Sequence, residues 1–95
     1  MTTPGKKVKD KVKKMLVEVG AYYFMPATGG YGRSGVPDLV ACIKGKFVGI
    51  ECKAGKNKTT ALQDRQLEMI RQSGGIALVI NEENIHEVEN IINGA

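Results

Sequence analysis

The 95 residues of this chain are enough for one hydrophobic core but not for two, since domains typically use about 100–150 residues. A hydrophobic content of 42% with 25% charged residues is that of a globular protein and excludes a disordered chain. No apolar run approaches the roughly 18 residues of a membrane span, and two cysteines exclude a disulfide scaffold. We interpret Cys42 and Cys52 as core residues, and we expect one domain over residues 1–95 in the reducing cytoplasm.

Charge is distributed unevenly along the chain. Residues 1–58 carry 12 Lys and Arg against four acids, whereas residues 59–95 carry two against six. A basic half beside an acidic half favours a polyanion, above all nucleic acid, although a solvated lysine face has the same composition. Aromatic residues make up only 5% of the chain, which favours phosphate contacts with duplex DNA over base stacking on single strands.

The first third of the chain predicts a basic helix and a short strand. Apolar residues at helical spacing predict an amphipathic helix from Pro4 to about Gly20, with lysines over its other faces. Residues 21–25 are rich in β-forming side chains and predict a strand that ends at Pro26. Residues 28–35 contain four glycines, which indicates a loop.

The remaining sequence predicts a hairpin, a helix, a strand and a last helix. We expect hairpin strands over 38–43 and 47–53, a helix from Thr59 or Thr60 to about Ser73, a buried strand over 76–80, and a helix capped by Asn81. The element order is then α-β-β-β-α-β-α. This order predicts an α/β fold in which helices flank a central mixed sheet.

Six residues are candidates for contacts with DNA. Arg33 and Ser34 lie in the glycine-rich loop beside the hairpin; a loop of this length often carries function, and the alternative is a plain connection between strands. The other candidates are lysines of the first helix and of the loop after the hairpin: Lys6, Lys7, Lys56 and Lys58.

The hairpin brings two acids and a lysine together. Side chains alternate along a strand, so Glu51 and Lys53 share one face. A two-residue Gly45-Lys46 turn of type II′ pairs Asp38 with Lys53 and places all three side chains on that face. A slip of one residue would bury Asp38 among apolar side chains, which is costly. The opposite face is apolar throughout: Leu39, Ala41, Ile43, Val48, Ile50 and Cys52.

Two adjacent carboxylates repel each other, so this arrangement favours a bound cation. Oxygen ligands with open positions suit Mg²⁺ or Mn²⁺, which can polarise a phosphodiester and lower the pKa of bound water. A neighbouring Lys53 can position the nucleophile or stabilise charge on the phosphate. The alternative is a surface Asp38 beside a Glu51–Lys53 cross-strand pair that has no chemical role.

These residues carry a resemblance to a known family. Gly35-Val36-Pro37-Asp38 followed by Ile50-Glu51-Cys52-Lys53 resembles the Pro-Asp…Glu-x-Lys signature of the PD-(D/E)XK nucleases. More narrowly, nearly the whole chain resembles the stand-alone VRR-NUC domain. The similarity extends to the lysine-rich first helix, the glycine loop, residues 59–63 and residues 73–77.

The resemblance implies a restriction-endonuclease-like fold and Mg²⁺- or Mn²⁺-dependent hydrolysis of branched DNA, as in phage-type Holliday junction resolvases. It implies that Asp38, Glu51 and the backbone carbonyl of Cys52 bind the metal. It also implies that Lys53 is the catalytic lysine and that Gln63 supports the site. The source is then a bacterium or a phage.

The chain departs from this family in its first helix, where Gly5 stands in place of the usual glutamate. We therefore expect one dominant metal, and the competing hypothesis is a catalytically silent, structure-specific DNA-binding module. A third hypothesis is an architectural basic protein that needs no metal. Residues 22–25 are apolar on both faces, and a homodimer that buries them would supply the two active sites that a two-fold junction requires.

Overall fold

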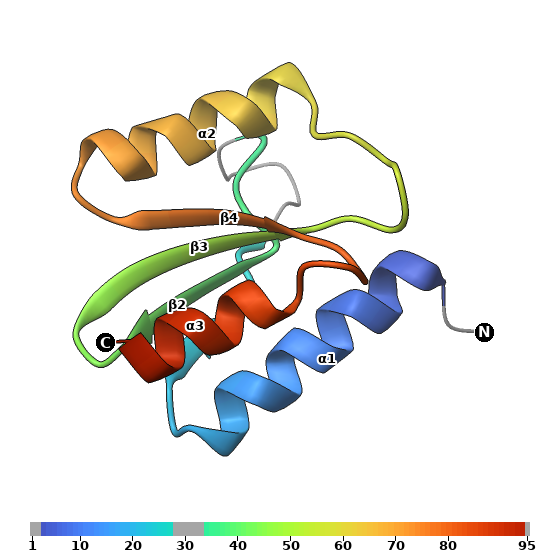
Figure 1. The fold of residues 1–95 in the computed structure, drawn as a ribbon. Coiled ribbons are helices and arrows are strands. Elements are labelled where there is room, and N and C mark those ends of the chain that lie inside the picture. The colour runs from blue at the N-terminus through green and yellow to red at the C-terminus, as the bar shows by residue number, and fades with distance from the viewer. Residues whose placement is uncertain (1–2, 28–33, 95) are drawn as a thin grey trace.

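The computed structural model describes residues 3–27 and 34–94, and its elements follow the predicted order (Figure 1). They are α1 (Pro4–Glu18), β1 (Tyr22–Phe24), β2 (Leu39–Ile43), β3 (Lys46–Cys52), α2 (Ala61–Gln72), β4 (Ile76–Ile80) and α3 (His86–Gly94). Within the described residues the strands form one sheet in the order β1-β2-β3-β4. The first three strands are antiparallel neighbours and β4 runs parallel to β3, so the predicted mixed sheet is confirmed.

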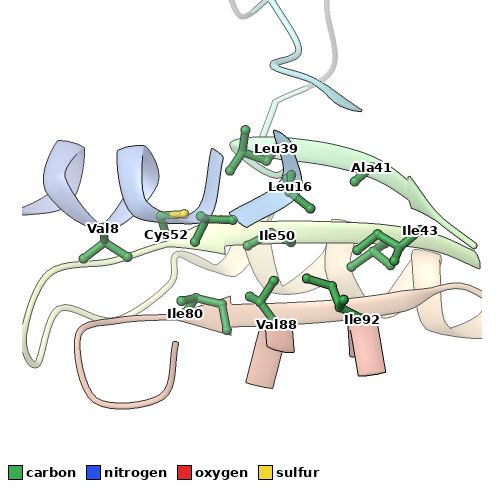
Figure 2. Close-up of a cluster of buried hydrophobic side chains, with 12 residues drawn as sticks. Val8, Leu16, Leu39, Ala41, Ile43, Ile50, Cys52, Ile80, Val88 and Ile92 are labelled. Carbon is green, nitrogen blue, oxygen red and sulfur yellow. The ribbon is translucent and has the colours of Figure 1, made fainter. Parts of the chain in front are cut away.

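Helices cover both faces of the sheet. Figure 1 shows α1 and α3 together on one face and α2 on the other. The main core lies under α1 and α3, where the apolar face of β2 and β3 meets the inner sides of both helices (Figure 2). Its buried members are Val8, Val12, Leu16, Leu39, Ala41, Ile43, Val48, Ile50, Cys52, Ile80, Val88 and Ile92. None of the helices in the described ranges is long and apolar enough to cross a membrane.

The hairpin register differs from the predicted one by two residues. Ile43 pairs with Lys46 and Leu39 with Ile50, so the turn is Lys44-Gly45 and not Gly45-Lys46. Both turn residues have positive φ, 50° and 85°, which fits a type I′ turn rather than the predicted type II′. A shift of two residues keeps every side chain on its predicted face, so the apolar face is confirmed.

The first helix ends near Gly20 as predicted, since α1 ends at Glu18, its C-cap is Val19 and Gly20 follows with a φ of +72°. Two local predictions are corrected. α3 begins only at His86, because the Asn81 side chain accepts hydrogen bonds from the backbone N–H groups of residues 83 and 84 and closes a separate turn. Cys52 is buried as predicted, but Cys42 is exposed on the other face of the sheet.

A close approach between α2 and the sheet depends on Gly49. A Cβ atom at this position would lie 2.6 Å from Cδ1 of Ile70 and 3.1 Å from Cγ of Pro37. The absence of a side chain at Gly49 therefore lets α2 settle directly on β3. The first turn of α2 thereby comes to lie beside the polar end of the hairpin.

Candidate active site

A cleft of about 610 Å³ opens between α1 and the polar end of the hairpin. Asp38 immediately precedes β2, Glu51 lies in β3, Lys53 follows that strand, and Gln63 lies in the first turn of α2. All four side chains predicted to carry catalysis line this one cleft. The other residues that line it are Thr3, Gly5, Lys6, Lys9, Asp10, Lys13, Met25 and Cys52.

Asp38 is fixed to the neighbouring strand through its side chain. Its Oδ2 accepts a hydrogen bond of 2.9 Å from the backbone N–H of Cys52. The register of the hairpin, extended one step beyond Leu39 and Ile50, places Asp38 opposite Glu51 rather than opposite Lys53. The other carboxylate oxygen, Oδ1, faces α1, with Nζ of Lys9 at 3.7 Å.

Glu51 is a buried acid, and only one of its two carboxylate oxygens has a polar partner in the described part of the chain. The residue is 2% exposed, and its Oε2 accepts a hydrogen bond of 2.9 Å from Nε2 of Gln63 and lies 3.4 Å from Nζ of Lys53. Its Oε1 is buried and has no hydrogen-bond partner within the described residues. Desolvation by burial, followed by the charge of Asp38, raises the pKa of Glu51 above its usual value, and Lys53 opposes this shift.

Gln63 connects the start of α2 to this buried acid. The Oε1 atom of Gln63 accepts a hydrogen bond of 2.9 Å from the backbone N–H of Thr60, and the backbone N–H of Gln63 donates to the Thr60 hydroxyl at 3.2 Å. These two bonds form a capping box, which satisfies backbone donors that the helix itself leaves unpaired. Because the amide oxygen serves the cap, the amide nitrogen is directed at Glu51.

The loop before Asp38 is packed against the same turn of α2. Gly35 has a φ of +79°, a conformation that residues with side chains rarely adopt. A Cβ atom at Gly35 would lie 2.5 Å from the backbone carbon of Leu62 and 2.9 Å from the backbone nitrogen of Gln63. Glycine at this position therefore lets the segment that leads into Asp38 and the helix that carries Gln63 converge.

The two carboxylates fit a divalent cation. An unpaired buried carboxylate oxygen is costly, and the Oε1 atom of Glu51 together with Oδ1 of Asp38 supplies the hard oxygen donors that Mg²⁺ or Mn²⁺ prefers. Burial raises the pKa of the Cys52 thiol to about 12, so its sulfur stays protonated and only its backbone carbonyl remains as a donor. Among the described residues no cluster of three or more His, Cys, Asp or Glu side chains is placed to hold a metal. The geometry therefore suits a cation that keeps several water or phosphate ligands.

The residues predicted to contact DNA are spread over more than one surface. Lys6 lines the cleft and pairs with Asp10 at 2.8 Å. Lys7 instead borders a separate cavity of about 550 Å³ between α1 and the turn before α3. Lys56 and Lys58 are exposed in the loop between β3 and α2, and Ser34 is exposed. Arg33 lies outside the described residues.

Lys9 is a cleft residue that the sequence did not single out. It is one of six lysines in the first helix, and their spacing gives no reason to prefer it. Its importance comes from its contact with Asp38, which depends on how α1 lies across the sheet.

Known proteins are similar to this chain in sequence and in fold. A relative from Acyrthosiphon pisum secondary endosymbiont phage 1, named "Putative nuclease p44", is 33% identical over 91 residues, covering 88% of this chain and 94% of its own. A solved structure of a VRR_NUC domain superposes with a TM-score of 0.76 at 23% identity and covers 97% of both chains. The structure of Archaeoglobus fulgidus Hjc, a Holliday junction resolvase, superposes with a TM-score of 0.61 at 25% identity, covering 81% of this chain and 67% of its own.

The family comparison covers almost the whole sequence. The family model described as archaeal Holliday junction resolvase (Hjc) matches residues 1–90. That range contains both acids, the lysine and the glutamine of the cleft. It also contains every helix and strand described above, apart from the end of α3. The chain therefore belongs to the Hjc-like Holliday junction resolvase family of PD-(D/E)XK nucleases, to which its VRR-NUC resemblance also points.

Proposed function

We propose that this protein is a metal-dependent, structure-specific endonuclease that hydrolyses phosphodiester bonds in branched DNA, with four-way junctions as its main substrate. The observation that carries this proposal is the buried Glu51 carboxylate, which lines one cleft with Asp38 and Lys53 and whose Oε1 has no hydrogen-bond partner within the described residues. Such a group is costly to the fold, which argues for a role in binding. Residues 1–95 then act as a single VRR-NUC nuclease domain in the cytoplasm of a bacterium or a phage-infected cell.

Each side chain of the cleft has a defined role. Asp38, Glu51 and the backbone carbonyl of Cys52 would hold one Mg²⁺ or Mn²⁺, which would polarise a phosphodiester and lower the pKa of bound water. Lys53 donates from the edge of the cleft to the attacking water or to a phosphate oxygen. Gln63 is a positioning residue, because its amide nitrogen donates to Oε2 of Glu51 and restrains that carboxylate.

Cleavage of a synthetic four-way junction tests the proposal directly. Labelled four-way, flap and linear duplex substrates of equal length are incubated with the protein and Mn²⁺ or Mg²⁺, and the products are resolved on denaturing gels. We expect metal-dependent cuts in the branched substrates and intact linear duplex. Junction binding without cleavage in either metal would favour the silent binding module. Equal, metal-independent binding of linear and branched DNA would favour the architectural protein.

The loop between β3 and α2 is expected to contact the phosphate backbone. Lys56 and Lys58 are both exposed there, in the same connection as Lys53, which directly follows β3. Each of Lys56→Gln and Lys58→Gln should make the negative slope of the log of the DNA-binding constant against log salt shallower by about one, because each phosphate contact releases roughly one counterion. Fluorescence anisotropy with a junction at several salt concentrations measures this slope.

The matched control is Lys46→Gln, which removes the same charge at the hairpin turn, at the far end of β3. This control should leave the slope unchanged. Identical slopes for wild type, Lys56→Gln and Lys58→Gln would remove this loop from the interface.

We also propose a homodimer that forms through an uncovered part of the sheet. Tyr22, Cys42 and Phe47 lie in one row across β1, β2 and β3, and all three are exposed. Phe24 stands beside them and is 48% exposed. A patch of exposed apolar side chains on an edge strand favours a protein interface. A second copy of this chain is the partner that fits, because a two-fold junction needs two cuts from two active sites.

The variant Phe24→Glu should convert this dimer to a monomer, because it places a charge within the apolar patch. Sedimentation velocity at micromolar concentration measures the change. Met69→Glu is the control, since Met69 is 42% exposed on α2 rather than on β1. A wild-type protein that sediments as a monomer would contradict the dimer.

A further inference from the structure

The face of α1 that lines the cleft carries lysines and no metal ligand at its start. Residues 4–7, the first turn of the helix, contain no acidic side chain. On the cleft side of the helix, Lys6, Lys9 and Lys13 follow one another at helical spacing from this first turn onward, and all three line the cleft. The helix therefore directs positive charge at the point where the two site carboxylates lie.

Lys9 differs from its two neighbours in its partner. Lys6 and Lys13 pair with Asp10 of their own helix, at 2.8 Å and 3.6 Å. Lys9 instead reaches across to the sheet, where its Nζ lies 3.7 Å from Oδ1 of Asp38. Its side chain is 33% exposed, so this contact is partly shielded from water and from salt.

Each carboxylate of the site thus has its own ammonium group. Lys53 stands beside Oε2 of Glu51 at 3.4 Å, and Lys9 stands beside Oδ1 of Asp38. The remaining oxygen of Asp38, Oδ2, already accepts the backbone N–H of Cys52. A cation that binds Asp38 through Oδ1 must therefore share or displace the contact with Lys9.

We propose that Lys9 is the second cation of the catalytic centre. In the metal-free protein it neutralises Asp38; when one divalent ion and DNA are bound, it turns to a non-bridging oxygen of the scissile phosphate. It stands on the cleft side of α1, the helix whose first turn holds no acid and whose cleft-lining Asp10 pairs with Lys6 and Lys13. The inference rests on the proposed nuclease function and deepens it, because it makes this a one-metal site flanked by two lysines.

Calorimetric titration with MnCl₂ in the absence of DNA tests the competition between Lys9 and the metal. Wild type should bind one Mn²⁺ per chain. Lys9→Gln should bind one Mn²⁺ about five-fold more tightly, at the low end of the usual coupling between two sites. Lys14→Gln, which removes the same charge from an exposed position of α1, should leave the affinity unchanged. Lys9→Glu supplies the missing acid and should bind a second ion.

Lys9→Gln should bind Mn²⁺ more tightly but cleave DNA more slowly, and these opposite effects distinguish the proposed role from a loss of folding. With saturating Mn²⁺, Lys9→Gln should cut a four-way junction roughly 100-fold more slowly, while Lys9→Arg keeps most of the rate. Misfolding would weaken both metal binding and cleavage, and circular dichroism would reveal it.

Three results would overturn the inference. They are two Mn²⁺ ions of similar affinity in wild type, unchanged Mn²⁺ affinity in Lys9→Gln, and cleavage by Lys9→Gln at the wild-type rate. If wild type cuts no junction, the proposed nuclease function fails by itself. In that case unchanged Mn²⁺ affinity in Lys9→Gln still refutes the competition at Asp38, and tighter binding supports it.

Discussion

Replacing Lys53 with methionine should abolish junction cleavage while leaving junction binding nearly intact. Methionine keeps the length and apolar stem of the side chain but removes the ammonium group that lies 3.4 Å from Oε2 of Glu51. A positioned donor that stabilises charge in the transition state is worth about 10²–10³-fold in kcat. Single-turnover cleavage of a labelled four-way junction measures this loss, and gel-shift titration in Ca²⁺ measures binding.

The control for Lys53→Met is Lys46→Met at the opposite end of β3, where the side chain is exposed and far along the strand from the acids. It should cut at the wild-type rate. A rate for Lys53→Met within about three-fold of wild type would contradict the proposal that Lys53 is the catalytic lysine, because removing a group that acts in the transition state should slow cleavage far more.

Glu51→Gln should stabilise the metal-free protein and abolish Mn²⁺ binding. Glu51 is almost fully buried, and its Oε1 has no partner within the described residues. An unsatisfied buried polar group costs about 1–3 kcal/mol, more when it is charged. Removing the charge should raise the Tm at pH 8 by about 4–8 °C, the shift that about 1 kcal/mol produces in a domain of this size.

The pH dependence of this stabilisation follows from the pKa of Glu51, which burial and Asp38 raise in the folded state. Between the unfolded and the folded pKa, the folded protein binds more protons than the unfolded chain, so wild-type stability falls as pH rises through that window. The gain in stability of Glu51→Gln over wild type should therefore be complete above the pKa of Glu51 in the folded protein. It should shrink as pH falls toward the pKa of Glu51 in the unfolded chain, near 4.5.

Thermal melts in EDTA from pH 4 to pH 8, together with Mn²⁺ calorimetry, measure both effects. The control is Glu68→Gln, an exposed acid of α2 whose pair with Arg71 at 3.7 Å lies on the surface. A Tm for Glu51→Gln below that of wild type at pH 8 would show that the buried carboxylate stabilises this fold, contrary to our account.

The alternation of side chains was readable from the sequence, but the pairing of individual residues was not. A polar–apolar pattern repeats every two residues, so it separates the two faces of the hairpin and gives the same result for registers that differ by two. The choice between those registers depends on the turn, and the structure places Lys44, a non-glycine residue, at positive φ. The two faces of the hairpin were therefore predicted correctly, whereas the predicted cross-strand partner of Asp38, Lys53, was wrong.

The site itself was predictable as far as it depends on local sequence. Asp38, Glu51 and Lys53 lie in one hairpin, and the capping box of Thr60 and Gln63 follows from their three-residue spacing. The contact of Lys9 with Asp38 was not predictable, because it depends on the angle at which α1 crosses the sheet. The late start of α3 was missed for a related reason, since the Asn81 side chain closes a turn where a helix cap was expected.

The two ends of the Gln63 amide couple the N-terminal cap of α2 to the orientation of the Glu51 carboxylate. Its oxygen completes the cap at Thr60, and its nitrogen restrains Glu51. Fraying of this single helical turn, an opening far smaller than denaturation, releases the carboxylate to rotate. Warming should thus abolish the proposed nuclease activity at temperatures where circular dichroism still reports the native fold.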